Sequence, residues 1–357
     1  MKNNIISLGI SNLSKGLSEN SFTSLDITKK YLEAIKIKNR TLNAFINILE
    51  ESAIWESKKS DKRRRDGKEL SPIDGIPIAI KDNIDIKDII TTGGIKAYRN
   101  EISKEDSFIV KLLKDAGAVI LGKLNMHEAA LGATTQNEFY GKCNNPHYIG
   151  FTPGGSSGGA GSAVAAGLCA GAIGTDTLGS IRIPASFCGT VGFKPTFGRI
   201  SNRGIMPLCK MLDHAGPITR SVEDASLLFE IISKFDFADP ECKNMKPYIH
   251  NSDLNIKSLH GKNIGFIDNN NISELNIDIQ LAYNQAILLL GSEGATINEI
   301  DIDNYFSPEK LIPQSMLIIE SELYNFHKTK IIENKKEFSD EFIKNINYAK
   351  NQDAPKL

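Results

Sequence analysis

The segment that most restricts the fold of this chain is 152–162, which reads TPGGSSGGAGS. Two adjacent serines lie between glycines there, and each glycine costs conformational entropy when the chain folds. The following residues up to 174 are mostly alanine, glycine and valine, whereas linkers are polar. We therefore expect a turn in which the backbone passes where a Cβ would not fit. A helix over 160–174, packed inside a core, should follow it.

The bulk properties of the chain bound its class. With 357 residues, 41% of them hydrophobic, it is long enough for one large α/β domain or two smaller ones. The formal net charge of −1 gives no reason to expect nucleic acid or a membrane as partner. Five cysteines without a CxxC pair indicate reduced thiols and neither a disulfide frame nor a zinc site. The first residues lack the apolar stretch of a signal peptide, so we expect a cytoplasmic protein.

Hydrophobic patterns along the rest of the chain alternate between helix and strand. Ser24 is expected to cap a helix whose buried face holds Ile27, Tyr31, Leu32 and Ile35. The basic residues of 51–70 are interleaved with acidic ones, so we interpret that helix as a solvated face and not as a nucleic-acid patch. Further strands are expected at 42–49, 76–80, 118–122, 263–268 and 295–300, with helices at 107–116 and 278–290. This alternation predicts an α/β fold whose sheet is covered by helices on both faces.

Three known glycine-dependent motifs can be compared with segment 152–162. A phosphate-binding loop needs GxxxxGK[ST], but Gly159 is followed by Ala160 and no lysine is in place. A dinucleotide-binding loop needs glycine or alanine where this chain has Val164. The nucleophile elbow GxSxG is satisfied around Ser157, but no buried strand is expected before it and no histidine has supporting context. The elbow therefore stays open as an alternative.

Two further stretches carry chemistry. In IPIAIKDN, Lys81 directly follows an apolar strand, and burial lowers the pKa of a lysine toward neutrality, so Lys81 could act as a general base. The structural alternative is a lysine paired with Asp82 or another carboxylate. In GTDTLGSIRIPASFCGTVGFKPTFGR, Ser180 ends the run TLGS. A tight turn there would aim successive backbone N–H groups at one point, as an oxyanion hole requires.

With these pieces the sequence resembles the amidase signature family, whose members are serine hydrolases of carboxamides with a lysine as base. The family motif runs GGSSGG, then a small-residue helix, then GTDxGGSxRxPAxFCGxxGxKPTxGR, and this chain matches nearly all of it. The blocks PIDGIPIAIKDN, GKLNMHEAALG, NNPHY and LDHAGPITRSVEDA agree as well. The resemblance is dense over 8–224 and weak beyond. It implies one amidase-signature domain over 1–357 with a central mixed sheet, divided into an N-terminal helical segment (1–70), the core motifs (75–224) and an incomplete C-terminal portion (225–357).

The resemblance also implies roles for individual residues. Ser180 would be the nucleophile, Lys81 the base, and Ser156, which follows a cis peptide bond, the serine that bridges them. Four backbone N–H groups would hold the oxyanion, namely those of Thr177, Leu178, Gly179 and Ser180. Ser157 would support the pair by hydrogen bonding, Ala130 would contribute to substrate binding, and Asp176 and Arg182 would fix the turn. No metal or organic cofactor is implied, and the expected partner is a small-molecule amide.

Two departures from the family pattern affect the expected activity. Leu178 stands where the family usually has glycine, so its side chain must find room beside the turn. Family members usually continue beyond the point where this chain ends. We therefore expect a shortened chain with uncovered apolar surface and reduced or lost activity.

The choice of amide divides two branches of the family. Ile183 in SIRIPA and His214 in LDHAGP favour the small-molecule amidases, because the glutaminase component of the tRNA-dependent amidotransferase, its A subunit, usually reads SIRQPA and LDQxGP. His214 itself is expected to pack or to form hydrogen bonds, not to react. Two alternatives remain: a glutaminase of that amidotransferase, which works with partner subunits B and C, and an inactive remnant of an amidase.

Overall fold

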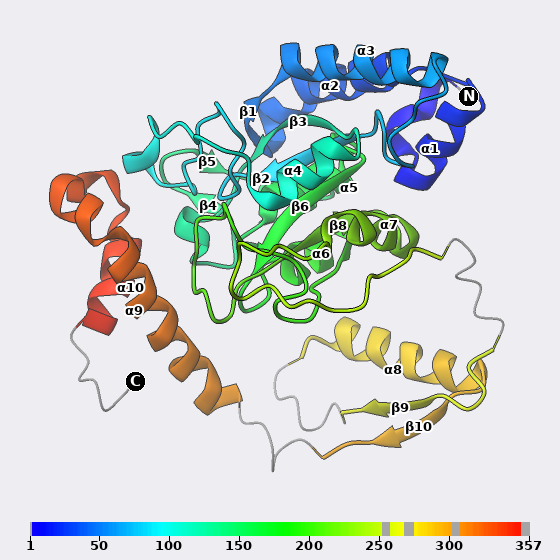
Figure 1. Cartoon of the computed structure of the whole chain (residues 1–357). Coiled ribbons are helices and arrows are strands. Elements are labelled where there is room, and N and C mark those ends of the chain that lie inside the picture. The colour runs from blue at the N-terminus through cyan, green and yellow to red at the C-terminus, as the bar shows by residue number, and fades with distance from the viewer. Residues whose placement is uncertain (1, 252–257, 268–274, 302–307, 351–357) are drawn as a thin grey trace. The chain divides into compact units, whose positions relative to one another are not determined.

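The computed structural model describes residues 2–251, 258–267, 275–301 and 308–350 (Figure 1). The chain divides into two compact units, Met1–His250 with Ile319–Lys356 and Asn251–Ile318. The assignment of a single domain to residues 1–357 stays a prediction.

The first unit is built on a mixed six-stranded sheet. Its strands lie in the order β1 (Phe45–Ile48), β3 (Val119–Leu124), β2 (Pro77–Lys81), β6 (Gly171–Asp176), β8 (His214–Thr219) and β7 (Val191–Gly192). Strands β3, β2 and β6 run parallel, and the other pairs are antiparallel.

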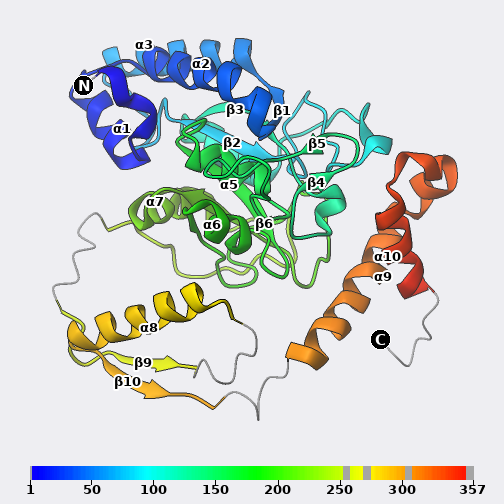
Figure 2. The same cartoon turned by 180° about the vertical axis from the view of Figure 1, so that it is seen from behind.

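Helices lie on both faces of this sheet, as the two opposite views show (Figures 1 and 2). The connection from β2 to β3 and the one from β3 to β6 cross the sheet in opposite directions. Right-handed crossovers therefore put their helices, α4 (Phe108–Asp115) and α5 (Gly158–Ala165), on opposite faces. The predicted α/β fold with a mixed, doubly covered sheet is confirmed.

Strand β2 lies between two parallel neighbours and is buried along its whole length. Strands covered on both faces read as continuous apolar runs, which is why 76–80 is recognisable in the sequence. Lys81 is the last residue of β2, and Asp176 is the last residue of the neighbouring β6. Both side chains therefore start from the carboxyl edge of the parallel strands, where open α/β sheets place their ligands.

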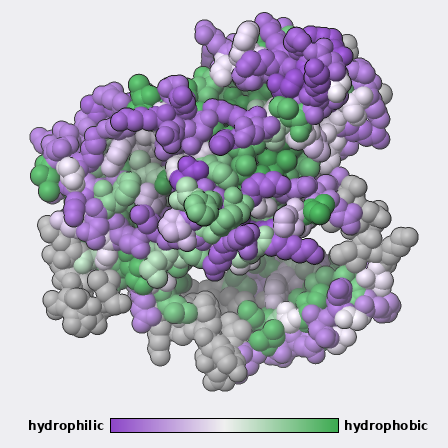
Figure 3. All heavy atoms as spheres, viewed as in Figure 1, coloured by the Kyte–Doolittle hydropathy of each residue, from purple (hydrophilic) through white to green (hydrophobic). Residues whose placement is uncertain are grey.

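The remaining elements of the first unit surround the sheet. They are η1 (Lys2–Ser7), α1 (Ile10–Ser18), α2 (Ser24–Leu42), α3 (Glu50–Arg65), η2 (Lys96–Tyr98), η3 (Glu128–Ala130), β4 (Gln136–Asn137), β5 (Gly141–Lys142), α6 (Arg182–Cys188), α7 (Val222–Ile232), the later part of α9 (Pro308–Asn334), η5 (Lys335–Glu337) and α10 (Asp340–Lys350). The surface of α3 is hydrophilic, as the prediction of a solvated face requires (Figure 3).

Helix α2 buries the predicted face of Ile27, Tyr31, Leu32 and Ile35. Its N-cap is Thr23 and not Ser24, so that part of the prediction is wrong. Thr23 and Asp26 form a reciprocal capping box, whereas the Ser24 hydroxyl donates to the carbonyl of Gly75 at 2.8 Å. The tertiary contact of Ser24 decides between two residues with similar capping propensity.

The small-residue run 160–174 does not form one helix as predicted. Helix α5 ends at Ala165, and the later residues enter the central strand β6. The close packing that the glycines suggested is present, because a Cβ on Gly159 would lie 2.3 Å from the carbonyl oxygen of Asn125 and 2.6 Å from that of Ala44. A run of alanine and glycine has no periodicity that separates a buried helix from a buried strand.

Helices α9 and α10 are held to the rest of the first unit by polar contacts. The Tyr98 hydroxyl lies 2.9 Å from Nδ1 of His327. The N–H of Ser339, just before α10, donates to the Glu128 carboxylate at 3.1 Å. The side chain of Phe326, on α9, lines a cavity together with residues of the segment between β7 and β8, such as Ile205 and Pro207.

The second unit holds β9 (Asn263–Phe266), α8 (Ile277–Ser292) and β10 (Thr296–Glu299). The two strands pair in parallel and form a separate sheet. The predicted strands and helix are confirmed over the described residues, whereas Asp268 lies outside them. Helix α8 buries none of its side chains, and Leu288 is 73% exposed.

The close approach of α5 to the loop after β3 predicts the effect of one methyl group. Gly159→Ala should lower the free energy of unfolding by about 2–3 kcal/mol, because its Cβ would meet backbone atoms that cannot move aside. Chemical denaturation measures this loss. The matched control is Gly67→Ala, where no atom lies within 4 Å of the new Cβ and only the left-handed φ of +64° costs about 1 kcal/mol. Equal losses would contradict the packing argument.

Candidate active site

Lys81 is fully buried at the end of β2. Its Nζ donates to Oγ of Ser156 at 2.7 Å and to Oγ1 of Thr175 at 2.8 Å. Burial lowers the pKa of Lys81 to about 7, although the charges of Asp213 and Asp176 act in the opposite direction. Lys81 does not form the ion pair with Asp82 that the sequence left open as the structural alternative.

Asp82 instead pairs with Lys123, whose Nζ lies 3.2 Å from its Oδ1. Asp82 also accepts hydrogen bonds from the backbone and the hydroxyl of Thr92. The neighbouring carboxylate is thus occupied, and Lys81 is left with hydroxyl and carbonyl partners.

Ser156 follows a cis peptide bond from Gly155, as the resemblance implies. Its side chain is fully buried against Lys81, and its carbonyl accepts the N–H of His127 at 3.1 Å. A Cβ on Gly155 would lie 2.7 Å from the backbone nitrogen of Thr134. Glycine is therefore required before Ser156 by close backbone packing.

Ser180, in the turn that follows β6, is 9% exposed. Its carbonyl accepts the N–H of Ser157 at 3.2 Å, which brings the two serine-bearing segments together. No hydrogen bond joins the Ser180 hydroxyl to Ser156 or to another residue that the structure describes. The structure thus brings Lys81 and Ser156 into direct contact and leaves the hydroxyl of Ser180 without a bonded partner in the described part of the chain.

The turn that carries Ser180 is organised by Asp176. Its buried carboxylate accepts the N–H of Gly179 at 2.8 Å and of Ile181 at 3.1 Å, and two hydrogen bonds from the Arg182 guanidinium. Burial raises the pKa of Asp176, but these bonds outweigh it and hold the pKa below its usual range. Asp176 and Arg182 fix the turn, as expected.

This arrangement changes the expected set of oxyanion donors. The N–H of Gly179 points at Asp176 and is not available to a ligand. The N–H groups of Thr177, Leu178 and Ser180 have no hydrogen-bond partner among the described residues. The side chain of Leu178 is 45% exposed, so it finds its room outside the packed turn.

Neither Ser157 nor Ala130 is hydrogen-bonded to Lys81 in the described part of the chain. The Ser157 hydroxyl donates to the carbonyl of Thr175 at 3.1 Å and accepts its N–H at 3.3 Å. Ala130 is buried with a φ of +60°, in the loop that reaches Ser156 through His127. Within the described residues Ser157 has no bond to a histidine, so the geometry does not support the nucleophile elbow.

His214, the first residue of β8, uses its ring to bind backbone. Its Nδ1 lies 2.7 Å from the carbonyl of Leu212 and 3.2 Å from that of Asp176. A hydrogen-bonding role is what the sequence predicts for it.

Two residues near Lys81 are missed by the sequence analysis. Thr175 receives hydrogen bonds from Lys81 and, at 3.2 Å, from Asn83. Asp213 accepts the hydroxyl of Thr177 at 2.5 Å. Thr175 lies in the motif GTD and Asp213 in the motif LDHAGP. Asp213 is brought to the turn because Asp176 pairs with His214 across β6 and β8.

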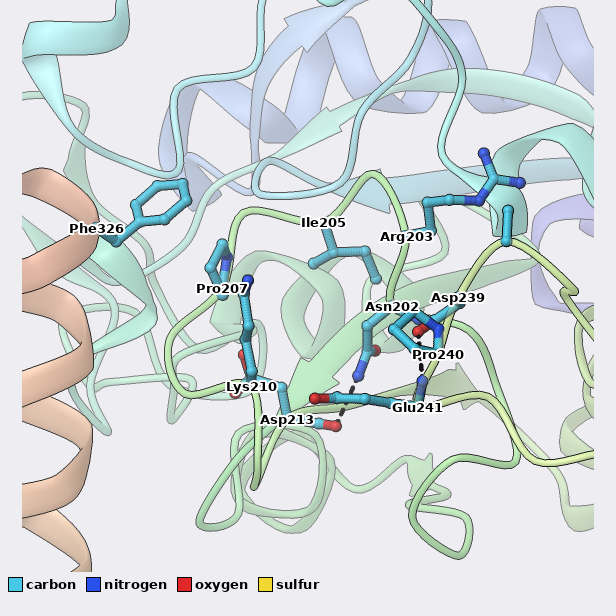
Figure 4. Close-up of a pocket in the computed structure, with 11 residues that line it drawn as sticks. Asn202, Arg203, Ile205, Pro207, Lys210, Asp213, Asp239, Pro240, Glu241 and Phe326 are labelled. Carbon is cyan, nitrogen blue, oxygen red and sulfur yellow. Dashed lines mark hydrogen bonds between the residues drawn. The ribbon is translucent and has the colours of Figure 1, made fainter.

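A cavity of about 360 Å³ lies beside Asp213 (Figure 4). It is lined from three parts of the chain, including Lys210, Glu241 and Phe326. Its volume is in the range of small-molecule sites. No group of His, Cys, Asp and Glu within the described ranges is arranged to hold a metal ion, and no helix described is long and apolar enough to cross a membrane.

Comparison with known proteins identifies the family. The family model named Amidase matches residues 26–352. The chain belongs to the amidase family. It is 37% identical over 300 residues to the A subunit of the glutamyl-tRNA(Gln) amidotransferase of Geobacter sp., which covers 84% of this chain. The chain spans only 61% of that relative's length.

Solved amidase-family structures share the fold. One, described as a vestigial protein complex that reveals the evolutionary origins of an s-triazine catabolic enzyme, matches with a TM-score of 0.90 and 32% identity. The match covers 98% of this chain and 75% of the chain in that structure. The peptide amidase from Stenotrophomonas maltophilia matches with a TM-score of 0.85 and 30% identity. This match covers 97% of our chain and 75% of the peptide amidase chain. The resemblance inferred from the motifs is confirmed.

The bonds of Asp176 predict a stability effect. Asp176→Ala should lower the free energy of unfolding by about 2–3 kcal/mol, because backbone N–H groups and Arg182 lose a charged acceptor. Thermal or urea unfolding measures the change. The control is Asp66→Ala, which removes an exposed pair with Lys62 and should cost about 0.5 kcal/mol. Similar losses in both variants would contradict this role of Asp176.

Proposed function

We propose that this chain hydrolyses a carboxamide through an acyl-enzyme intermediate on Ser180. The observation that carries the proposal is the contact between Lys81 and Ser156. A fully buried lysine whose pKa lies at about 7 donates to a serine hydroxyl and is bonded to no carboxylate. A general base works best with a pKa close to the operating pH, and Lys81 meets this condition. Membership of the amidase family supports the same reaction class.

In the proposed relay, protons shift from Ser180 through Ser156 to Lys81, and later return along the same path. Neutral Lys81 Nζ takes the proton of Ser156 Oγ while Ser156 Oγ takes that of Ser180. The Ser180 oxygen attacks the amide carbon, and the carbonyl electrons move onto the oxygen. When the C–N bond breaks, the proton returns through Ser156 to the leaving nitrogen, and water then hydrolyses the acyl-serine. The hydrogen bond between the two serines has to form when substrate binds, as such bonds often tighten only in the complex.

The oxyanion would be held by backbone donors of the turn. We assign the N–H groups of Thr177, Leu178 and Ser180 to this role. Gly179 is excluded from the set because its N–H binds Asp176. Donors fixed before the reaction cost no reorganisation when charge develops on the oxygen. No step of the relay requires a metal or an organic cofactor.

For the substrate we propose a small-molecule amide, with the protein working in the cytoplasm. Ile183 and His214 depart from the pattern of the amidotransferase branch, and the five cysteines are all free and buried. Ser157 and the loop of Ala130 would support the nucleophile segment and the substrate side of the site.

A second candidate function rests on the curated relatives. Several are named as the A subunits of glutamyl-tRNA(Gln) amidotransferases, and the one from Acinetobacter baumannii is 39% identical over 318 residues. In that case the chain would release ammonia from an amide in a complex with two partner subunits, B and C. Purified chain that releases ammonia from simple amides favours the first candidate, whereas activity only in a complex with partner subunits favours the second.

The first test is labelling with a fluorophosphonate probe, read by intact-mass spectrometry. The parent chain should gain one adduct. Ser180→Ala should gain none, and Lys81→Met, which keeps the volume of the side chain, should react at least about 100-fold more slowly because the base is lost. The matched control is Ser162→Ala, a buried serine of α5 that donates to the carbonyl of Asn144 and should label like the parent. An adduct that survives Ser180→Ala would contradict the assignment of the nucleophile.

The pKa of Lys81 predicts the pH dependence of labelling. Only the neutral amine accepts a proton, so the rate should rise roughly tenfold per pH unit below the pKa and level off above it. The midpoint is expected at about pH 7. Labelling rates from pH 5 to 9, at fixed ionic strength, measure this profile. A rate independent of pH across that range would contradict Lys81 as the base.

A further inference from the structure

Asp213 is a buried carboxylate beside the site that has no cationic side chain bonded to it among the described residues. It is 7% exposed. One oxygen accepts the hydroxyl of Thr177 at 2.5 Å, and the other accepts the N–H groups of Leu208 at 2.8 Å and Cys209 at 3.0 Å. All its hydrogen-bond donors in the described structure are neutral.

The other carboxylates around Lys81 are already neutralised. Asp82 pairs with Lys123, and Asp176 pairs with Arg182 at 2.9 Å. Lys81 itself is bonded to hydroxyls, and a buried ammonium is costly unless an opposite charge faces it. Of the acidic groups that act on Lys81, Asp213 is therefore the one whose charge is not cancelled by a bonded cation.

The interaction between these two residues is reciprocal. The Asp213 carboxylate favours the charged form of Lys81, ahead of Asp176, and Lys81 in turn favours the charged form of Asp213. Burial nonetheless raises the pKa of Asp213 to about 6. His127 is another titratable group whose charge interacts with that of Lys81.

The surroundings of Asp213 on its other side are mixed in charge. It borders the cavity of Figure 4 together with the side chains of Lys210, Arg203, Asp239 and Glu241. Arg203 is bonded to Asp236 at 2.7 Å, and the thiol of Cys209 also interacts with the charge of Asp213. None of these groups forms a direct ion pair with Asp213 in the described structure.

We propose that Asp213 is a positioning residue of this site with two effects. Its carboxylate is the counter-charge for the protonated amino group of Lys81, and its bond to the Thr177 hydroxyl fixes the first residue of the turn that carries the proposed oxyanion donors. The second effect rests on the proposed function, whereas the first concerns the protonation of Lys81 and stands without it.

The counter-charge is tested by titrating Lys81 directly. NMR of the full chain with ¹³Cε-labelled lysine follows its protonation, and Lys81→Met assigns the signal. In Asp213→Asn the Lys81 pKa should fall by on the order of one unit, because the ammonium loses its counter-charge. Asp213→Ser gives the same test if the amide variant does not fold. An unchanged Lys81 pKa in the folded variant would overturn this half of the proposal.

The matched control is Asp74→Asn. Asp74 is also a fully buried aspartate, but it precedes β2 and so lies at the opposite end of that strand from Lys81. Asp74→Asn should leave the pKa of Lys81 unchanged. A shift equal to that of Asp213→Asn would mean that any loss of buried charge moves Lys81, and the assignment to Asp213 would be wrong.

The effect on the turn is tested by probe labelling above pH 8, where Lys81 is neutral. Thr177→Val should slow labelling about tenfold, and Thr177→Ser, which keeps the hydroxyl, should restore the parental rate. Equal rates in all three proteins would overturn this half. If no protein labels, while Asp213→Asn still shifts the Lys81 titration, the counter-charge is upheld and the proposed function is the part that fails.

Discussion

The rest of the site depends on one buried amino group. Lys81 is placed by the central parallel strand β2, where both faces of the sheet are covered and the side chain is shielded from solvent. At that position the ammonium loses its hydration, and among the residues that the structure describes only Ser156 and Thr175 replace water as hydrogen-bond partners. The fold thus sets the proton affinity of Lys81 through the position of a strand end, before any catalytic partner is considered.

Bringing serines to such a lysine requires backbone to pack on backbone. A Cβ on Gly159 would lie 2.3 Å from the carbonyl oxygen of Asn125, and one on Gly155 would meet the segment 133–135. These contacts explain the glycines of TPGGSSGGAGS better than flexibility does. The segment is buried and bonded at nearly every residue, so the entropy lost by its glycines is offset by close packing of α5 against β6 and the loop after β3.

The sequence predicts those parts of the fold whose signal is local. The apolar runs at 76–80 and 118–122 identify β2 and β3, and the motif blocks identify the contact of Lys81 with Ser156 and the role of Asp176. It does not predict where α5 ends and β6 begins, because small residues suit a buried helix and a buried strand equally. It also misses the loss of the Gly179 N–H, which follows from the direction of one carboxylate and not from residue type.

Asp213 illustrates what a motif cannot convey. The block LDHAGP marks the residue, but its contact with Thr177 arises only because β8 runs antiparallel to β6 and brings His214 opposite Asp176. Around Lys81 the described acids then fall into two kinds: Asp82 and Asp176, each bonded to a cation, and Asp213, bonded to neutral donors. A site that must take up and release a proton needs this asymmetry. An acid bonded directly to Lys81 would hold it permanently charged, whereas an acid that acts through space stabilises the ammonium only while the proton is there.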